Sequence, residues 1–177
     1  MSMYQAHPLS DRTIEIVPAQ QVEIPSTDPQ HYVSGIYALN VPAPEETTGD
    51  WHDVFHWREG LDRPRQVQLG GSSWADTNAI YDGRDSLASI GIEVARGEPV
   101  FVANHFRAIL DLLYHPLTTH EAVYNLTGAT EDWLDTDEQK AFVLDKANLL
   151  RPHISPKANE ALTAWIEREQ RGRLSWR

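Results

Sequence analysis

Two short segments combine histidine with acidic, amide or guanidinium side chains at spacings that could support chemistry. The first is GDWHDVFHW at 49–57, in which His52 and His56 are four residues apart. On a helix this spacing places both imidazoles on one face, as in two-histidine metal sites. His52 and His56 are therefore the candidate ligands of a divalent metal. Asp50 or Asp53 could add an oxygen ligand or orient an imidazole.

This first segment differs from the H-E-x-x-H metal motif, because residue 53 is Asp and no third ligand can be assigned. The alternative interpretation therefore stays open. In that case the three aromatic residues of the segment pack on the core, and the histidines cap a helix or face solvent.

The second segment is NHFR at 104–107, within an otherwise apolar stretch. His105 would act as a general acid or base, because the pKa of imidazole lies near neutrality, and Arg107 would bind an anion. The alternative is an ion pair between Arg107 and Asp111 on a core helix. If the two segments meet in space, the candidate catalytic residues are Asp50, His52, Asn104, His105 and Arg107.

A third candidate is the acidic run at 131–138, which surrounds Trp133 and Leu134. Acidic residues are favoured in the first turn of a helix by the macrodipole, so the run could simply be a solvated helix start. It could also contact a basic protein partner, with Trp133 as the anchor and the acids steering association. The candidate partner-binding residues are Glu131, Asp132, Trp133 and Asp135.

The chain of 177 residues carries 26 acidic and 15 basic side chains, a net charge of −11. The excess lies mainly in two blocks, 1–66 and 121–145, each with a net charge of −6, whereas the arginine-bearing tail at 167–177 is basic. Binding to phosphate backbones needs concentrated Lys and Arg, so the overall charge argues against nucleic acid. Basic proteins, cations and small molecules remain as partners, and homo-oligomerisation is left open.

The sequence has no Cys, which excludes disulfides, thiolate metal sites and thiol nucleophiles. No stretch reaches the roughly 18–20 apolar residues that span a bilayer. Met1–Ser10 has neither the basic nor the apolar region of a signal peptide, so we expect a cytoplasmic protein. No cofactor motif is present, and a divalent metal is the one cofactor that the sequence leaves open.

Alternation of apolar and polar residues predicts strands at 13–17 and 22–24 in the N-terminal half. Further along, we expect a helix at 32–39, where Gly35 and the Tyr, Val and Ile content also allow a strand. A short helix at 49–57 and a strand at 90–94 follow. In the C-terminal half, an apolar helix is predicted from Pro99 through Tyr114. Capping patterns predict three further helices, and these begin at Thr118, Thr136 and Ser155.

These elements predict an α+β fold, in which a small N-terminal β portion packs on a helix-dominated C-terminal half. We expect a single domain over 1–177, divided into mixed short elements at 1–97, helices at 98–171 and a flexible tail at 172–177.

The blocks SGIYALNVP at 34–42, GDWH at 49–52 and ANHFRA at 103–108 resemble segments of a family of uncharacterised bacterial proteins. That family is associated with mobile-element and toxin–antitoxin-like loci, and the resemblance covers roughly residues 30–115. It implies a bacterial, cytoplasmic protein of a defence or toxin–antitoxin context, with no catalytic residues assigned.

Two functions follow as hypotheses. The first is an acidic protein that binds and restrains a basic protein partner, as an antitoxin or inhibitor does. The second is a small metal-assisted hydrolase or nucleotide-processing enzyme that uses the GDWH and NHFR segments.

Overall fold

The computed structural model describes residues 24–49, 57, 69–70, 77–92, 94 and 97–172. The strands within these ranges are β1 (Tyr32–Val33), β2 (Leu69–Gly70), β3 (Ile80–Asp82) and β4 (Phe101–Ala103). The helices are α1 (Gly35–Leu39), α3 (Arg84–Ser89), α4 (His105–His120), α5 (Ala129–Trp133), α6 (Asp137–Lys146) and α7 (Pro156–Gly172). The described residues also form two 3₁₀ helices, η1 (Thr77–Ala79) and η2 (Ala147–His153).

The four described strands form one sheet in the order β2-β1-β4-β3. Strand β1 pairs antiparallel with β2 and parallel with β4, and β3 pairs antiparallel with β4. Val102 of β4 faces Val33 on one side and Tyr81 on the other. Because β4 lies between two neighbours, its end holds the start of helix α4 in a fixed place.

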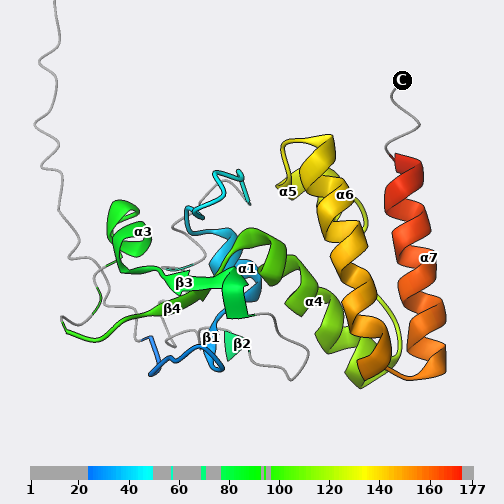
Figure 1. The fold of residues 1–177 in the computed structure, drawn as a ribbon, viewed down its shortest axis with the longest axis horizontal. Helices are drawn as coiled ribbons and strands as arrows, with labels where there is room; N and C mark the ends of the chain where they lie inside the picture. Colours follow the sequence, from blue (N-terminus) through cyan, green and yellow to red (C-terminus); the bar gives the residue numbers. More distant parts are fainter. Residues whose placement is uncertain are drawn as a thin grey trace, which may run out of the picture.

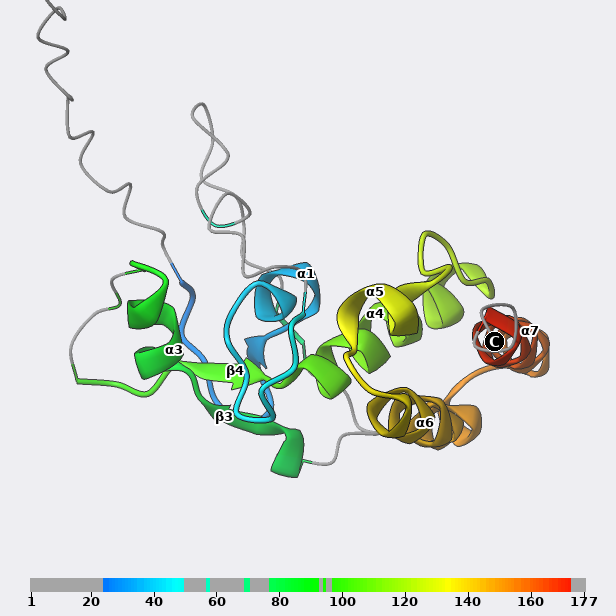
Figure 2. The same cartoon turned by 90° about the horizontal axis from the view of Figure 1, so that it is seen from above.

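Figure 1 shows the sheet and α3 at one end of the molecule and α6 and α7 at the other, with α4 running between them. Figure 2 shows α5, α6 and α7 grouped around α4, which contacts both α6 and α7. Buried side chains of the sheet, α4 and α7 belong to one hydrophobic core. The expected α+β fold with a helix-dominated C-terminal half is thereby confirmed.

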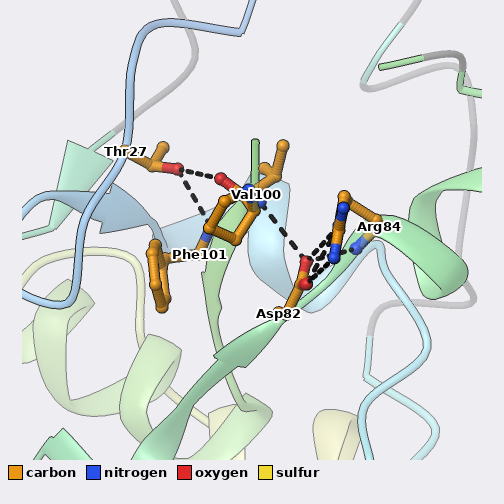
Figure 3. Close-up of polar contacts among 6 residues, drawn as sticks. Thr27, Asp82, Arg84, Val100 and Phe101 are labelled. Atoms are coloured by element: carbon orange, nitrogen blue, oxygen red, sulfur yellow. Dashed lines mark hydrogen bonds and ion pairs between the residues drawn. The ribbon is translucent and has the colours of Figure 1, made fainter. Parts of the chain in front are cut away.

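Two side chains hold the beginning of β4 (Figure 3). The Phe101 N–H donates to Thr27 Oγ1 at 2.9 Å, and the Val100 N–H donates to Asp82 Oδ1 at 3.3 Å. Arg84 in turn forms an ion pair with Asp82 at 2.5 Å, and its hydrogen bonds hold the pKa of that carboxyl below its ordinary value. These contacts fix the strand that leads into α4.

The helix predicted from Pro99 begins later than expected. Phe101–Ala103 is a strand, and α4 starts only at His105, after Asn104 as its N-cap. The apolar run that suggested one helix is buried on both sides by β1 and β3, so strand pairing overrides its helical spacing. The segment expected to be purely helical at 98–171 therefore contains a strand.

The helix start predicted at Thr118 is also wrong. Helix α4 continues through Pro116 to His120, and the Thr118 hydroxyl donates to the Tyr114 carbonyl within it. The helix ends at His120, and its C-cap Glu121 has a left-handed φ of 53°. Gly128 precedes the next helix, α5, as its N-cap.

The other two capping predictions are confirmed. Thr136 Oγ1 accepts from the Gln139 N–H at 3.2 Å while the Gln139 side chain accepts from the Thr136 N–H, which is a complete capping box. Ser155 Oγ accepts from the Ala158 N–H at 3.2 Å at the start of α7. Helix α7 runs to Gly172, where the description ends.

Two N-terminal predictions are corrected. Residues 32–39 divide into strand β1 and helix α1, because Ser34 is extended and separates them. The described part of the strand predicted at 90–94 is a turn that ends α3, in which Gly91 has a φ of 77°. The strands predicted at 13–17 and 22–24 and the helix predicted at 49–57 lie outside the described residues, except for Ile24, Gly49 and Trp57.

Candidate functional site

Asn104 links β4 to α4 and also reaches a distant loop. Its Oδ1 accepts from the Arg107 N–H at 2.9 Å, which caps the helix. Its Nδ2 donates to Glu45 Oε1 at 2.5 Å. One amide thus joins the start of α4 to the loop at 40–49.

His105 is fully buried behind the same loop. Its Nε2 lies 2.8 Å from the Val41 carbonyl oxygen, and its Nδ1 pairs with Thr47 Oγ1. A carbonyl only accepts, so Nε2 carries a hydrogen, and in the neutral ring Nδ1 accepts from the threonine hydroxyl. Both ring nitrogens are therefore engaged in holding the loop.

Arg107 belongs to a buried network of hydrogen bonds that includes an ion pair. Its Nε donates to Asp111 Oδ1 at 3.0 Å, as the alternative interpretation of the sequence predicts. Its guanidinium also donates to the Tyr32 hydroxyl and lies over the Tyr32 ring, with 5.3 Å from Cζ to the centroid. Ser34 Oγ and Tyr32 OH both donate to Asp111 Oδ2, at 2.6 and 3.1 Å. The network ties β1 to α4.

Burial dominates the electrostatics of this network. It raises the pKa of the Asp111 carboxyl above its ordinary value, although the Arg107 guanidinium opposes the shift. Burial also raises the pKa of the Tyr32 phenol, with a further contribution from the Asp111 carboxylate. These groups are placed to hold the sheet against the helix.

A pocket of about 320 Å³ opens on the other side of the NHFR turn. It lies between the start of α4, helices α6 and η2, η1 and the loop at 40–49. Asn104, Phe106 and Arg107 line it, whereas His105 does not. The turn singled out in the sequence does line a pocket, through residues other than its histidine.

The walls of this pocket are mainly apolar, and three charged residues also line it: Glu45, Arg107 and Lys146. The apolar wall includes Phe106 and Phe142, whose ring centroids are 5.0 Å apart, together with Leu110 and Leu149. Glu45 lies at one side, and Lys146 lies at another with its Nζ 5.4 Å from the Phe142 ring centroid.

Several of these lining residues were not selected from the sequence. Phe142 and Leu149 are apolar residues that follow the helix start predicted at Thr136, and both are 45% exposed. The sequence feature that could have indicated them is the number of apolar residues in the segment 142–150, which exceeds what one buried helix face contains. Val143, Leu144, Ala147 and Leu150 already form its buried face.

The candidate partner-binding residues lie at the surface and contact their own chain. Glu131 forms an ion pair with Lys140 at 2.7 Å, and Asp135 accepts from Thr48 Oγ1 at 2.8 Å. Asp132 is exposed, and Trp133 is half-buried against the core.

The Thr48–Asp135 hydrogen bond brings two acidic parts of the chain together, and Figures 1 and 2 show the loop at 40–49 beside α5. We call the exposed acids of both parts the acidic rim: Glu45, Glu46, Glu131, Asp132, Asp135, Asp137 and Glu138. Glu45 also lines the pocket, so the rim borders it.

The metal prediction falls on residues that the structure does not describe. Asp50, His52 and His56 lie outside the described ranges, although the adjacent Gly49 contacts the His105 ring. Within the described part of the chain, no group of three or more His, Asp or Glu side chains could hold a metal ion.

Comparisons of the chain with protein-family models, with curated proteins and with solved structures find no match. No helix in the described ranges is both long and apolar enough to cross a membrane.

Proposed function

We propose that this protein binds and restrains a basic protein partner, in the manner of an antitoxin or an inhibitor, through the acidic rim. The observation that carries the proposal is the hydrogen bond between Thr48 and Asp135. It joins the acids of the loop at 40–49 to those of α5 and α6. A concentrated negative surface accelerates and orients association with a positive one.

The roles of the buried residues favour binding over catalysis. A general base must reach a substrate proton, directly or through one water. His105 is fully buried, and its ring nitrogens face Val41 and Thr47. The residue with the best chemistry for acid–base work therefore holds a loop that carries part of the acidic rim.

The proposal includes a bacterial, cytoplasmic location and a toxin–antitoxin or defence context, which rest on the sequence resemblance. The acidic surface also predicts how the rate of association with the partner depends on salt. Association with the partner should be fast at low salt and should slow as salt screens the charges.

The test begins with capture of a partner from the native host, followed by purification of that partner and titration calorimetry. We expect the triple variant Glu45→Gln, Glu46→Gln, Asp135→Asn to weaken binding at least tenfold and to flatten its salt dependence. The matched control neutralises two exposed acids of α7, Glu160→Gln and Glu167→Gln, and should bind as the wild type does. Equal affinity of the triple variant would overturn the proposal.

A metal-assisted hydrolase or nucleotide-processing enzyme is the second candidate, supported by the presence of Asn104 and Arg107 in the pocket lining. Its test is the metal content of protein purified without chelator, compared with that of His52→Ala. A stoichiometric metal that the substitution removes would favour this function over binding alone.

A further inference from the structure

We infer that the pocket beside α4 receives a bulky apolar side chain, Leu, Phe or Trp, from a cationic segment of the partner. The inference rests on the proposed function and adds the chemistry of the segment that binds. It starts from the exposed side chains. Only three large hydrophobic residues are exposed in the described ranges, namely Tyr124, Phe142 and Leu149, and two of these line this pocket.

The apolar residues of α6 and η2 form two separate surfaces. One faces the core, with Val143, Leu144 and Leu150 buried. The other contains Phe142 of α6 and Leu149 of η2, which both line the pocket. Apolar residues gathered at a concave surface mark binding sites, whereas single exposed ones are ordinary.

The pocket is large enough to receive one bulky side chain. Its volume of about 320 Å³ lies at the lower end of the range of about 300–1,000 Å³ found for ligand pockets. The tilted pair of Phe106 and Phe142 offers a third ring an edge or a face. Anchors that fill such pockets contribute most of the affinity of an interface.

The acidic rim beside the pocket selects a cationic segment. The two cations of the lining are engaged within the chain, since Arg107 pairs with Asp111 and Lys146 lies over the Phe142 ring. Glu45 lies on the pocket wall and also belongs to the acidic rim. Glu138, another residue of the rim, lies one helical turn before Phe142. Lys and Arg next to the anchor would pair with these carboxylates. Lys146, held over the Phe142 ring, is placed to donate to a backbone carbonyl of the segment.

A second copy of this chain is a poorer occupant, because it would bring two acidic rims toward each other. Each copy carries a net charge of −11, and like charges placed opposite one another oppose association. A small apolar molecule would fill the pocket but would leave the rim without a role.

The experiment measures the binding of fluorescent synthetic peptides by anisotropy. Each peptide has a central Trp, Leu, Phe or Ser, flanked by Lys and Arg, by Asp and Glu, or by Gly and Ser. We expect the cationic peptides with an apolar centre to bind at least tenfold more tightly than those with Ser or with other flanks. Phe142→Ser and Leu149→Gln should each weaken the binding of these peptides at least tenfold.

Tyr124→Ser is the matched control, because Tyr124 is 57% exposed and does not line the pocket. It should leave binding unchanged, and circular dichroism will show that all variants are folded. Unchanged peptide binding by both Phe142→Ser and Leu149→Gln would overturn the inference. The proposed function would survive that result if the acidic-rim variant still loses the purified partner.

Three other outcomes would also overturn the inference. The first is the absence of binding by every cationic peptide. The second is equal binding of peptides with neutral flanks or saturation by indole alone, either of which would define a general apolar pocket. The third is a concentration-dependent dimer in sedimentation that Phe142→Ser abolishes, which would identify a second copy as the occupant.

Discussion

At the scale of single residues, the polar side chains of the NHFR turn are structural connectors. Asn104 reaches Glu45, His105 reaches Val41 and Thr47, and Arg107 reaches Tyr32. Buried polar groups cost free energy unless they are hydrogen-bonded, and each of these is bonded to a segment far away in sequence. The turn thus determines how the sheet and the loop at 40–49 meet α4.

Asp111→Asn should destabilise the protein strongly. The substitution leaves the Arg107 guanidinium buried without its anion, and removal of one partner from a buried ion pair costs about 3–5 kcal/mol. The double variant Arg107→Met, Asp111→Leu should recover only part of this loss, because it removes both buried charges but leaves the Ser34 and Tyr32 hydroxyls without their acceptor. Urea unfolding measures the free energy of unfolding of both variants and the wild type. Equal stability of Asp111→Asn and the wild type would contradict a stabilising role of the buried Arg107–Asp111 ion pair.

The buried tyrosines predict a loss of stability at alkaline pH. Burial raises the pKa of Tyr81 to about 12, and it raises that of Tyr32 as well. Above about pH 10 the unfolded chain releases these phenolic protons while the folded chain keeps them. The free energy of unfolding should then fall by up to about 1.4 kcal/mol per pH unit for each tyrosine.

Unfolding curves and tyrosinate absorbance, both measured across alkaline pH, check this expectation. Tyr81→Phe and Tyr32→Phe should each make the decline shallower and remove one late-ionising phenol. A slope that neither substitution changes would show that other groups control alkaline unfolding.

At the scale of elements, the sequence predicted what local contacts determine. The helix starts at Thr136 and Ser155 depend on hydroxyls that bond within three residues, so the pattern alone is sufficient. The start of α4 depends on β4 pairing with β1 and β3, which are distant in sequence. The pocket was missed for the same reason, because Glu45 and Phe142 meet only through tertiary packing.

The loop at 40–49 depends on Gly49, which has a φ of +58°. A Cβ there would collide with the Leu39 carbonyl oxygen and lie 2.6 Å from His105 Cε1. We expect Gly49→Ala to cost about 2–5 kcal/mol, from left-handed backbone strain and overpacking together. Thermal unfolding measures the loss.

Gly172→Ala is the control for this loop variant, because a Cβ at Gly172 has no neighbour within 4 Å. It should be neutral or slightly stabilising, since Ala favours a helix. Similar stabilities for the two variants would show that the Gly49 position is not tightly packed.

At the scale of the whole molecule, the fold brings together charge that the sequence keeps apart. The two acidic blocks are separated by most of the sheet and by α4, yet Thr48 and Asp135 join parts of both. Like charges held close oppose folding, so a surface of this kind reduces the stability of the free protein. Such a cost is expected where a surface serves binding.

The acidic rim therefore predicts a gain in stability when its charge is removed. Glu46→Gln should raise Tm by about 1 °C at low ionic strength, because it removes repulsion without breaking an ion pair given for the described residues. Glu46 is chosen because Asp132 and Glu138 lie in the first turns of α5 and α6, where the macrodipole stabilises a carboxylate. The gain should vanish in molar salt, which shortens the Debye length to about 3 Å. Glu160→Gln with Glu167→Gln on α7 should give no such gain, since Lys157 lies three residues before Glu160 and Arg171 lies four residues after Glu167 on that helix. A rise in Tm that persists at high salt, or that the α7 control shares, would mean that the rim acids do not repel one another, and the electrostatic basis for a basic partner would fall with it.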